Sequence, residues 1–473
     1  MTHGYFSEGT RPENNTAIRQ RICGLPSWVW AIAFVACIAC AHLAYGLWFW
    51  TKSPTNAPKA ALSLKGEDFL KSFPGWDTEE ERDQAAYNRP AIEILKTGVP
   101  RYRTGAFFDH APVYAYFLAA CYWIGGVRLL SVVIPQAVLS GLTGLLLAIA
   151  AWRLAPVWRP AAAAIAAFMV LINVRVASFV GTISTLPLTL AIHALAFYLA
   201  VSATRPWKYI LFALVTVFGV YTTASYFLVG CAAAAWLIWG FMRSRLPAQL
   251  IGAGMILVGV ITKLALVSVP GDPLREVDKA MFWYGNNPYY ESVGWFDLWT
   301  VREDPTWTPW LPWQASDAEK ARYNDYLQRA GGDKRKAGLL WAWENPMEYV
   351  KMCFVRLRAT LGPLTGHMRL WQNKLVSTLL WLLVFPAGFF GLWRARRTLH
   401  GQLGWFIVLA VCGFETFVIA GLQQRYRLPV DVILIVFAAT VYAGLMARMA
   451  SKLPSFLTTP ARNATRPCGG MTA

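Results

Sequence analysis

Acidic residues are absent from a long stretch of this 473-residue chain, since residues 128–269 contain neither Asp nor Glu. Of the 26 acids in the chain, all but four lie in two segments, 51–127 and 270–375. Proton- and sodium-coupled transporters usually need carboxylates inside their membrane helices, so this distribution argues against that class. Two acids fall elsewhere in apolar runs, Glu415 and Asp431.

Charge of either sign is also scarce, because 15% of the residues are charged and 56% are hydrophobic. The eight cysteines are mostly scattered, and the C-x-x-C pair Cys37 and Cys40 lies in an apolar run without partner ligands, which favours a structural role. Lys and Arg outnumber the acids by 44 to 26, but no basic, aromatic-studded soluble domain is present. We therefore expect no nucleic-acid partner.

Long apolar runs take the place of charged surface. Runs of roughly 20 residues are long enough to cross the hydrocarbon core of a bilayer. The sequence therefore predicts an all-α polytopic membrane protein with about ten transmembrane helices. The ten predicted spans are residues 28–50, 128–151, 160–174, 182–203, 208–222, 226–242, 248–268, 376–393, 403–422 and 429–447.

The basic connectors between these spans predict the orientation of the chain. If the N-terminal tail is cytoplasmic, alternating the spans places most basic connectors and the basic C-terminal tail on the cytoplasmic side. The two acid-bearing segments then lie on the outer face. The predicted divisions are a cytoplasmic tail at 1–27, a transmembrane core at 28–268 that includes the first outer loop at 51–127, an aromatic-rich outer loop at 270–375, C-terminal transmembrane helices at 376–447 and a cytoplasmic basic tail at 448–473.

The first outer loop contains an acidic helix with the sequence "DTEEERDQAAYNRPAIEILKTG", residues 77–98. Thr78 and Glu81 have the spacing of a capping box. Asp83 is the first residue of an apolar stripe with helical spacing, so it either presents its carboxylate to the bundle or only favours the helix N-terminus electrostatically. The predicted stripe consists of Asp83, Tyr87, Ala91, Ile94 and Leu95.

The order of several motifs resembles that of a known enzyme family. The spacing of Asp83 and Tyr87 is followed by "FFDHAPVYAYFLAACYWIGG" and "IPQAVLSGLTGLLL", and later by "NPMEYVKMCFVRLRATLGP" and "QQRYRLPVDVILIVFAA". Together they resemble the GT-C glycosyltransferases that use polyprenyl-phosphate sugars, in the bacterial branch related to protein O-mannosyltransferases and to the lipid A aminoarabinose transferase. The resemblance implies a GT-C type helical bundle in a bacterial inner membrane, with juxtamembrane helices and the active site on the periplasmic side.

By this resemblance Asp83 is the catalytic carboxylate. The role is chemically sensible, because a hydroxyl that attacks an anomeric carbon becomes strongly acidic and needs a carboxylate within hydrogen-bond reach. Polyprenyl phosphate leaves without prior protonation, so one base and cations for the phosphate can suffice. Tyr87 is assigned to substrate binding, and the rival acid Asp77 is interpreted as a helix-start residue.

Asp109 and His110, in "FFDHAP", lie where the aminoarabinose branch has an acid followed by a lysine. The resemblance implies that they bind the lipid phosphate or together hold a divalent metal ion, which would be the one cofactor. The alternative is that the pair only caps the following helix. That helix, predicted over 112–126, is too short to span and is expected to lie at the membrane interface.

Basic residues on the outer side depart from the usual charge pattern of membrane proteins. Guanidinium groups bind phosphate well, so Arg425, Arg427 and Lys263 are predicted to bind the donor phosphate. Arg175, at the outer end of the third span, is a further candidate. Snorkelling of the side chain to lipid headgroups is the competing interpretation for Arg427 and, more strongly, for Arg175.

The sequence also departs from the family. Leu186 precedes Pro187 where the family often has an acid, and "GVYTTASYF" lacks the basic residue expected after the fifth span. The donor site must therefore be completed differently, or the activity is altered or lost. The Trp- and Tyr-rich part of 270–375 suits both carbohydrate recognition and an interfacial belt.

These observations predict a membrane glycosyltransferase, with inversion at the anomeric carbon. It would transfer a sugar from a polyprenyl-phosphate donor to a hydroxyl of a glycan, lipid or protein acceptor on the outer face, in contact with membrane lipids. The alternative from another class is a non-catalytic carrier or flippase of lipid-linked glycans, because a fold alone does not establish an activity.

Overall fold

The computed structural model describes residues 27–52, 63–72, 83–100, 112–223, 226–267, 317–362, 371–417 and 424–452. Within these ranges every regular element is an α-helix. Six helices, or seven when one bent pair is counted as a single span, are long and apolar enough to cross a membrane. The prediction of an all-α polytopic membrane protein is confirmed.

Each of the ten predicted spans coincides with a helix. Three of these helices are apolar but shorter than a typical span, so the number that cross the bilayer stays a prediction. The ten are α1 (Ser27–Lys52), α5 (Leu129–Leu154), α6 (Arg159–Leu171), α8 (Leu186–Val201), α9 (Pro206–Val220), α10 (Tyr226–Ser244), α11 (Pro247–Val267), α17 (Trp371–Arg394), α18 (Leu399–Phe417) and α19 (Gln424–Lys452).

The third predicted span, 160–174, is broken in the structure. Helix α6 ends at Leu171, and a separate helix, α7 (Val174–Val180), continues at an angle of 55°. The side chain of Asn173 accepts hydrogen bonds from the backbone N–H groups of Arg175 and Val176, at 3.2 and 3.3 Å, so it caps the start of α7. The apolar run continues through the break, which is why composition alone predicted one helix.

The C-terminal helix α19 lies at the centre of the bundle. Its residues 427–439 are all buried, as expected for a helix that is apolar on every side over most of its length. It packs against α17, α6, α5, α18 and α8. At the edge, α1 packs against α5 and α7, and a Cβ atom on Gly46 would lie only 2.6 Å from the backbone nitrogen of Gly181.

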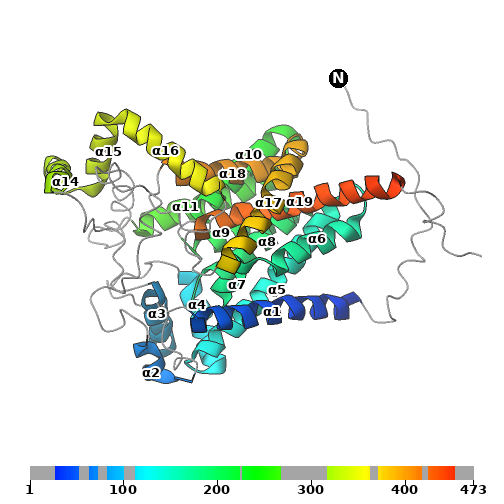
Figure 1. The fold of residues 1–473 in the computed structure, drawn as a ribbon, viewed down its shortest axis with the longest axis horizontal. Helices are drawn as coiled ribbons and strands as arrows, with labels where there is room; N and C mark the ends of the chain where they lie inside the picture. The colour runs from blue at the N-terminus through cyan, green and yellow to red at the C-terminus, as the bar shows by residue number, and fades with distance from the viewer. Residues whose placement is uncertain are drawn as a thin grey trace, which may run out of the picture.

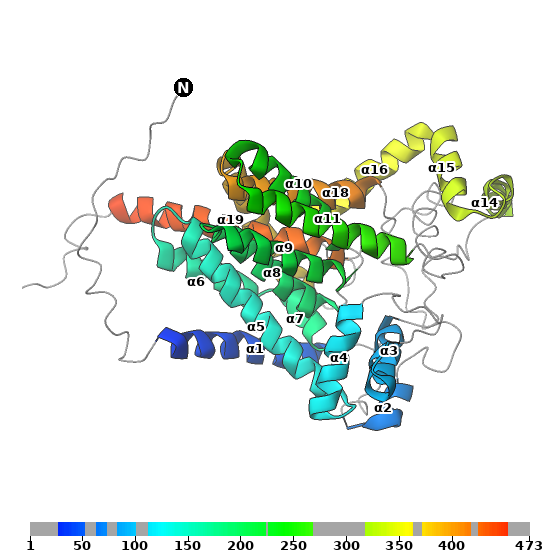
Figure 2. The ribbon, with the colours of Figure 1, turned by 180° about the vertical axis from the view of Figure 1, so that it is seen from behind.

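The remaining helices gather at one end of the bundle. Figure 1 shows them at the end opposite the first residue of α1 and the last residue of α19, and Figure 2 shows the same arrangement from behind. Both acid-bearing segments therefore contribute to the same end. These helices are α2 (Gly66–Lys71), α3 (Asp83–Thr97), α4 (Pro112–Gly125), α14 (Asp317–Arg329), α15 (Lys334–Glu344) and α16 (Pro346–Leu361).

Helix α4 matches the short helix predicted over 112–126, and α3 matches the acidic helix with one correction. Ala91 is fully buried, but Leu95 is 40% exposed, whereas Ala85 and Asn88 are fully buried. The buried face of α3 is therefore rotated relative to the predicted stripe, because α3 packs on α4. The residues Thr78 and Glu81 of the predicted capping box lie outside the described ranges.

Helix α16 exposes large apolar side chains and buries two polar ones, although its charged Lys351 is also exposed. Met347 and Phe354 are 69% and 68% exposed, whereas Arg356 and Thr360 are 1% and 2% exposed. A large exposed apolar face is unusual in water and is the normal arrangement for a helix that faces lipid. Because Lys351, one turn after Met347, is exposed on the same face, this face of α16 is apolar with one charged side chain, which suits a position at the edge of a membrane.

Candidate anion-binding site

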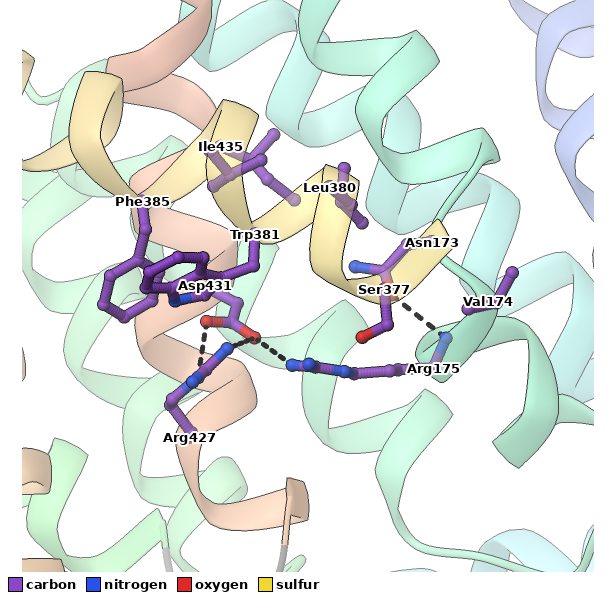
Figure 3. Close-up of a pocket in the computed structure, with 11 residues that line it drawn as sticks. Asn173, Val174, Arg175, Ser377, Leu380, Trp381, Phe385, Arg427, Asp431 and Ile435 are labelled. Atoms are coloured by element: carbon purple, nitrogen blue, oxygen red, sulfur yellow. Dashed lines mark hydrogen bonds and ion pairs between the residues drawn. The ribbon is translucent and has the colours of Figure 1, made fainter. Parts of the chain in front are cut away.

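A small, partly open cavity lies where α7 faces α17 and the first turns of α19. Its charged lining consists of two arginines and one aspartate, so the cavity carries a net positive charge among its described residues. Figure 3 shows the two arginines reaching the carboxylate of Asp431 from different helices. The lining residues are Asn173, Val174, Arg175, Ser377, Leu380, Trp381, Val384, Phe385, Arg427, Asp431 and Ile435.

Arg427 and Asp431 lie one helical turn apart on α19 and form a buried ion pair. The Arg427 Nε–H donates to Asp431 Oδ1 at 2.9 Å, and Nη2 donates to Oδ2 at 3.4 Å. Nη1 donates to the backbone carbonyls of Thr360, at 2.8 Å, and Gly362. These carbonyls belong to the C-terminal end of α16, where a cation is favoured by the unpaired carbonyl groups and the helix dipole.

Four of the five N–H bonds of Arg427 are thereby used. The guanidinium also lies 4.8 Å from the ring centroid of Phe385, which is a cation–π distance. The side chain is 3% exposed, so it does not snorkel to solvent. These contacts hold Arg427 within the protein, and among the described residues one N–H is left for a ligand, so its predicted binding of the donor phosphate stays a prediction.

Arg175 is placed differently from the expectation that it snorkels to the headgroups. It is 4% exposed, and its Nη1 lies 3.6 Å from Asp431 Oδ2. Its Nε and Nη2 atoms are buried and have no hydrogen-bond partner among the described residues. A buried guanidinium with unused donors is costly unless a ligand or water satisfies them, so Arg175 is a candidate anion-binding group of the cavity.

Neutral polar groups on α17 add to the site. Ser377 lines the cavity and is 2% exposed, and its hydroxyl has no hydrogen-bond partner within the described ranges. The amide nitrogen of Asn373, one turn earlier on α17, is also buried and has no partner in those ranges. The combination of a spare guanidinium edge, a spare hydroxyl and net positive charge suits a tetrahedral oxyanion such as a phosphate ester.

The structure does not bring Lys263 to this cavity. Its Nζ donates to the backbone carbonyls of Val220 and, at 3.1 Å, of Thr223, at the C-terminal end of α9. An ammonium group is favoured there for the same reason as Arg427 at the end of α16. The observed contacts of Lys263 are therefore those of a helix cap.

Tyr87 packs inside the α3–α4 pair. It is 8% exposed, and its ring meets that of Tyr114 edge to face, with centroids 5.2 Å apart and planes at 85°. The hydroxyl of Tyr122 on α4 donates to Asn88 Oδ1 on α3. These contacts fix α3 on α4, and they favour a packing role for Tyr87 over the predicted contact with substrate.

The other predicted site residues cannot be compared with the cavity. Asp83 is the first residue of α3 and Arg425 the second residue of α19, but their side chains lie outside what the structure describes. Asp109 and His110 are also outside the described ranges. Within those ranges no group of three His, Cys, Asp or Glu side chains is placed to hold a metal ion.

Asp431 and Ser377 line the cavity, and neither was predicted as a site residue from the sequence. The spacing of Asp431, four residues after Arg427 in an otherwise apolar helix, is the signal that could have identified it, because i and i+4 side chains meet on a helix. Ser377 offers no comparable signal. Its importance depends on α7 being bent toward α17.

No family model matches the chain, and a search of curated proteins gives no match. Among solved structures, the chain is similar to the archaeal oligosaccharyltransferase AglB from Archaeoglobus fulgidus in complex with an inhibitory peptide and a dolichol-phosphate. The sequence identity is 13%, the TM-score is 0.46, and the match covers 94% of this chain and 53% of that chain. The chain thus spans about half the length of the AglB structure.

A second similar structure is ArnT from Cupriavidus metallidurans bound to undecaprenyl phosphate. Here the identity is 14% and the TM-score 0.38, over 91% of this chain and 82% of that chain. Both structures resemble this chain in the arrangement of their helices. With TM-scores below 0.5, the likeness assigns to this chain neither an activity nor the role of any residue.

Proposed function

We propose that this chain is a membrane glycosyltransferase that transfers a sugar from a polyprenyl-phosphate donor to an acceptor hydroxyl on the outer face of a bacterial inner membrane. The observation that carries the proposal is the cavity with two buried guanidinium groups against one carboxylate, in which Nε and Nη2 of Arg175 have no hydrogen-bond partner in the part of the chain that the structure describes. Such a site needs an anion.

The cavity suits the phosphate of a lipid-linked donor. It lies among membrane helices, so the polyprenyl chain would remain in the bilayer while the phosphate enters between α7 and α17. Arg175 and Ser377 would donate hydrogen bonds to its oxygens, and Arg427 would hold Asp431 and the end of α16 in place. Asp431 would also complete the site where the family's acid is replaced by Leu186.

Asp83 is proposed as the general base. The acceptor oxygen attacks the anomeric carbon from the side opposite the phosphate, the bond between that carbon and the phosphate oxygen breaks, and the acceptor proton passes to the Asp83 carboxylate. The leaving group is polyprenyl phosphate, whose charge the cavity stabilises, and the configuration at the anomeric carbon inverts. Asp109 and His110 remain candidates for binding substrate or a divalent metal.

The test compares Asp83→Asn with Asp77→Asn. Removal of a general base costs roughly 10²–10⁴-fold in rate, so transfer by Asp83→Asn should fall by at least roughly a hundredfold. A helix-terminus charge contributes about 1 kcal/mol at most, so its thermal stability should match the parent. Asp77→Asn should keep most of the activity.

The assay is single-turnover release of polyprenyl phosphate from a panel of synthetic undecaprenyl-phosphate sugars, with and without a membrane extract as the source of acceptor. Near-parental transfer by Asp83→Asn would contradict the catalytic assignment. A carrier or flippase would bind the same lipids and leave them intact in the parent itself. That outcome would replace the proposed activity with the alternative.

A further inference from the structure

Gln136, in the first third of α5, joins several other parts of the chain through four hydrogen bonds. Its Nε2 donates to the carbonyls of Val180, at 3.0 Å, and Thr182, at 2.6 Å. Its Oε1 accepts from the Tyr114 hydroxyl, at 2.9 Å, and from the Ser184 backbone N–H, at 3.4 Å. The side chain is fully buried, and these bonds use its entire hydrogen-bonding capacity.

On one side, Gln136 fixes the helix that carries Arg175. Val180 is the last residue of α7, so its carbonyl has no partner within the helix and is satisfied by Gln136 instead. The other end of α7 is capped by Asn173. A helix of seven residues cannot hold its direction alone, so these two side chains aim Arg175 into the cavity.

On the other side, Gln136 is linked through Tyr114 on α4 to α3, the helix that carries Asp83. Tyr114 meets Tyr87 edge to face, and Tyr87 lies one turn after Asp83 on α3. Burial raises the pKa of both Tyr114 and Tyr122, so both hydroxyls stay protonated and donate their hydrogen bonds. A continuous set of contacts therefore runs from α3 through α4 and Gln136 to α7.

We infer that Gln136 is a positioning residue that sets the placement of α3 and α4 relative to α7. The inference rests on the proposed function, in which the acceptor is activated from α3 and the phosphate is bound from α7. Transfer requires the base, the anomeric carbon and the phosphate to be held in register, and small displacements of such groups reduce the rate strongly. Gln136 maintains this relative placement of the helices without contacting the substrate.

Three variants separate this role from simple packing. Gln136→Met keeps the length of the side chain and removes all four hydrogen bonds. Tyr114→Phe removes only the link to α4 and leaves the two bonds to the end of α7. The matched control is Thr143→Val on the same helix, because the buried Thr143 hydroxyl donates only to the Leu139 carbonyl of α5 itself.

The first measurement is hydrogen exchange of the full-length protein without ligand. Loss of the Tyr114 hydroxyl loosens Gln136, so Tyr114→Phe should speed exchange in α7 by about fivefold or more, although the substitution is on α4. Gln136→Met should speed exchange in both α4 and α7, and Thr143→Val in neither. Parental exchange in α7 of Tyr114→Phe would overturn the inference.

The second measurement separates binding from turnover. Tyr114→Phe should bind farnesyl phosphate within about twofold of the parent, because α7 keeps its cap, and should lose about tenfold or more in transfer from the undecaprenyl-phosphate sugars. Gln136→Met should lose both. Parental transfer by Tyr114→Phe would reduce Gln136 to a packing residue. If the parent neither binds farnesyl phosphate nor turns over a donor, the proposed function fails, and hydrogen exchange still decides the coupling.

Discussion

The chain clusters arginine and carboxylate side chains in two regions, one buried in the helical bundle and one exposed on a hairpin. In the bundle, the side chains of Arg427 and Asp431 are 3% and 11% exposed, and Arg175 approaches the same carboxylate. On the outer hairpin of α14 and α15, Arg329 is 41% exposed and lies between Asp325 and Glu344. The bundle cluster has one positive charge in excess, whereas the hairpin cluster has one negative charge in excess.

The difference teaches how burial changes the meaning of an ion pair. In the hairpin, water screens each charge and would replace any lost partner, so the pairs contribute little to stability. In the bundle the Arg175 guanidinium is buried, so the donors that have no partner among the described residues must meet a ligand or a water molecule or remain costly. The same residue types thus form weak surface ion pairs in one region and a candidate binding site in the other.

The largest effect should come from removing the shared carboxylate. Asp431→Asn keeps the shape of the side chain but leaves two buried guanidinium groups without an anion, which should destabilise the protein by about 3–5 kcal/mol. The measurement is the thermal unfolding midpoint in detergent. Asp325→Asn on the hairpin is the matched control and should unfold almost like the parent. Equal shifts of the unfolding midpoint in the two variants would contradict the expected difference between the buried and the exposed ion pairs.

An intermediate effect should follow from removing the surplus cation. Arg175→Leu leaves Arg427 and Asp431 as a balanced pair, so the unfolding midpoint should stay at or above that of the parent. Affinity for farnesyl phosphate should fall by about tenfold or more, the effect of losing a charged hydrogen bond. A large loss of stability with unchanged binding would make Arg175 a structural cation.

The smallest effect is expected at Glu344. Its hydrogen bonds with Arg329 lower the pKa of the Glu344 carboxyl, so the contribution to stability is present above the pKa of unfolded Glu, about 4.3, and is lost as the pH falls through the lower folded value. Because the group is exposed, Glu344→Gln should speed hydrogen exchange in α15 only slightly at pH 7. The difference from the parent should become smaller as the pH falls below about 4.3. A strong effect at pH 7 would show that the hairpin pair is not screened.

The helices were predictable because their signal is local. Ten apolar runs gave ten helices, and the short helix α4 was predicted within one residue at its C-terminal end, since length, turn residues and composition determine such elements. The bend between α6 and α7 was not predicted. Asn173 is the signal for it, but a single Asn in an apolar run can equally remain inside a helix.

The site was less predictable because it depends on contacts across the sequence. Arg427 contacts the carbonyls of Thr360 and Gly362 at the end of α16, far from it in sequence, so these partners could not be inferred from the residues around it. Its binding of the donor phosphate stays a prediction. Arg175 faces a cavity only because α7 is bent and capped. Lys263 contacts the end of α9, which no pattern along α11 indicates.

Helix α16 has a consequence for how related sequences should vary. Its lipid-facing positions, such as Met347 and Phe354, need only be apolar, so many side chains serve equally well there. Arg356 and Thr360 are enclosed by the bundle, and the backbone that follows them binds Arg427, so few replacements fit. Among homologues, the exposed apolar positions of α16 should therefore vary, whereas its buried polar positions, Arg356 and Thr360, should stay constant. A helix on a water-soluble protein shows the reverse pattern.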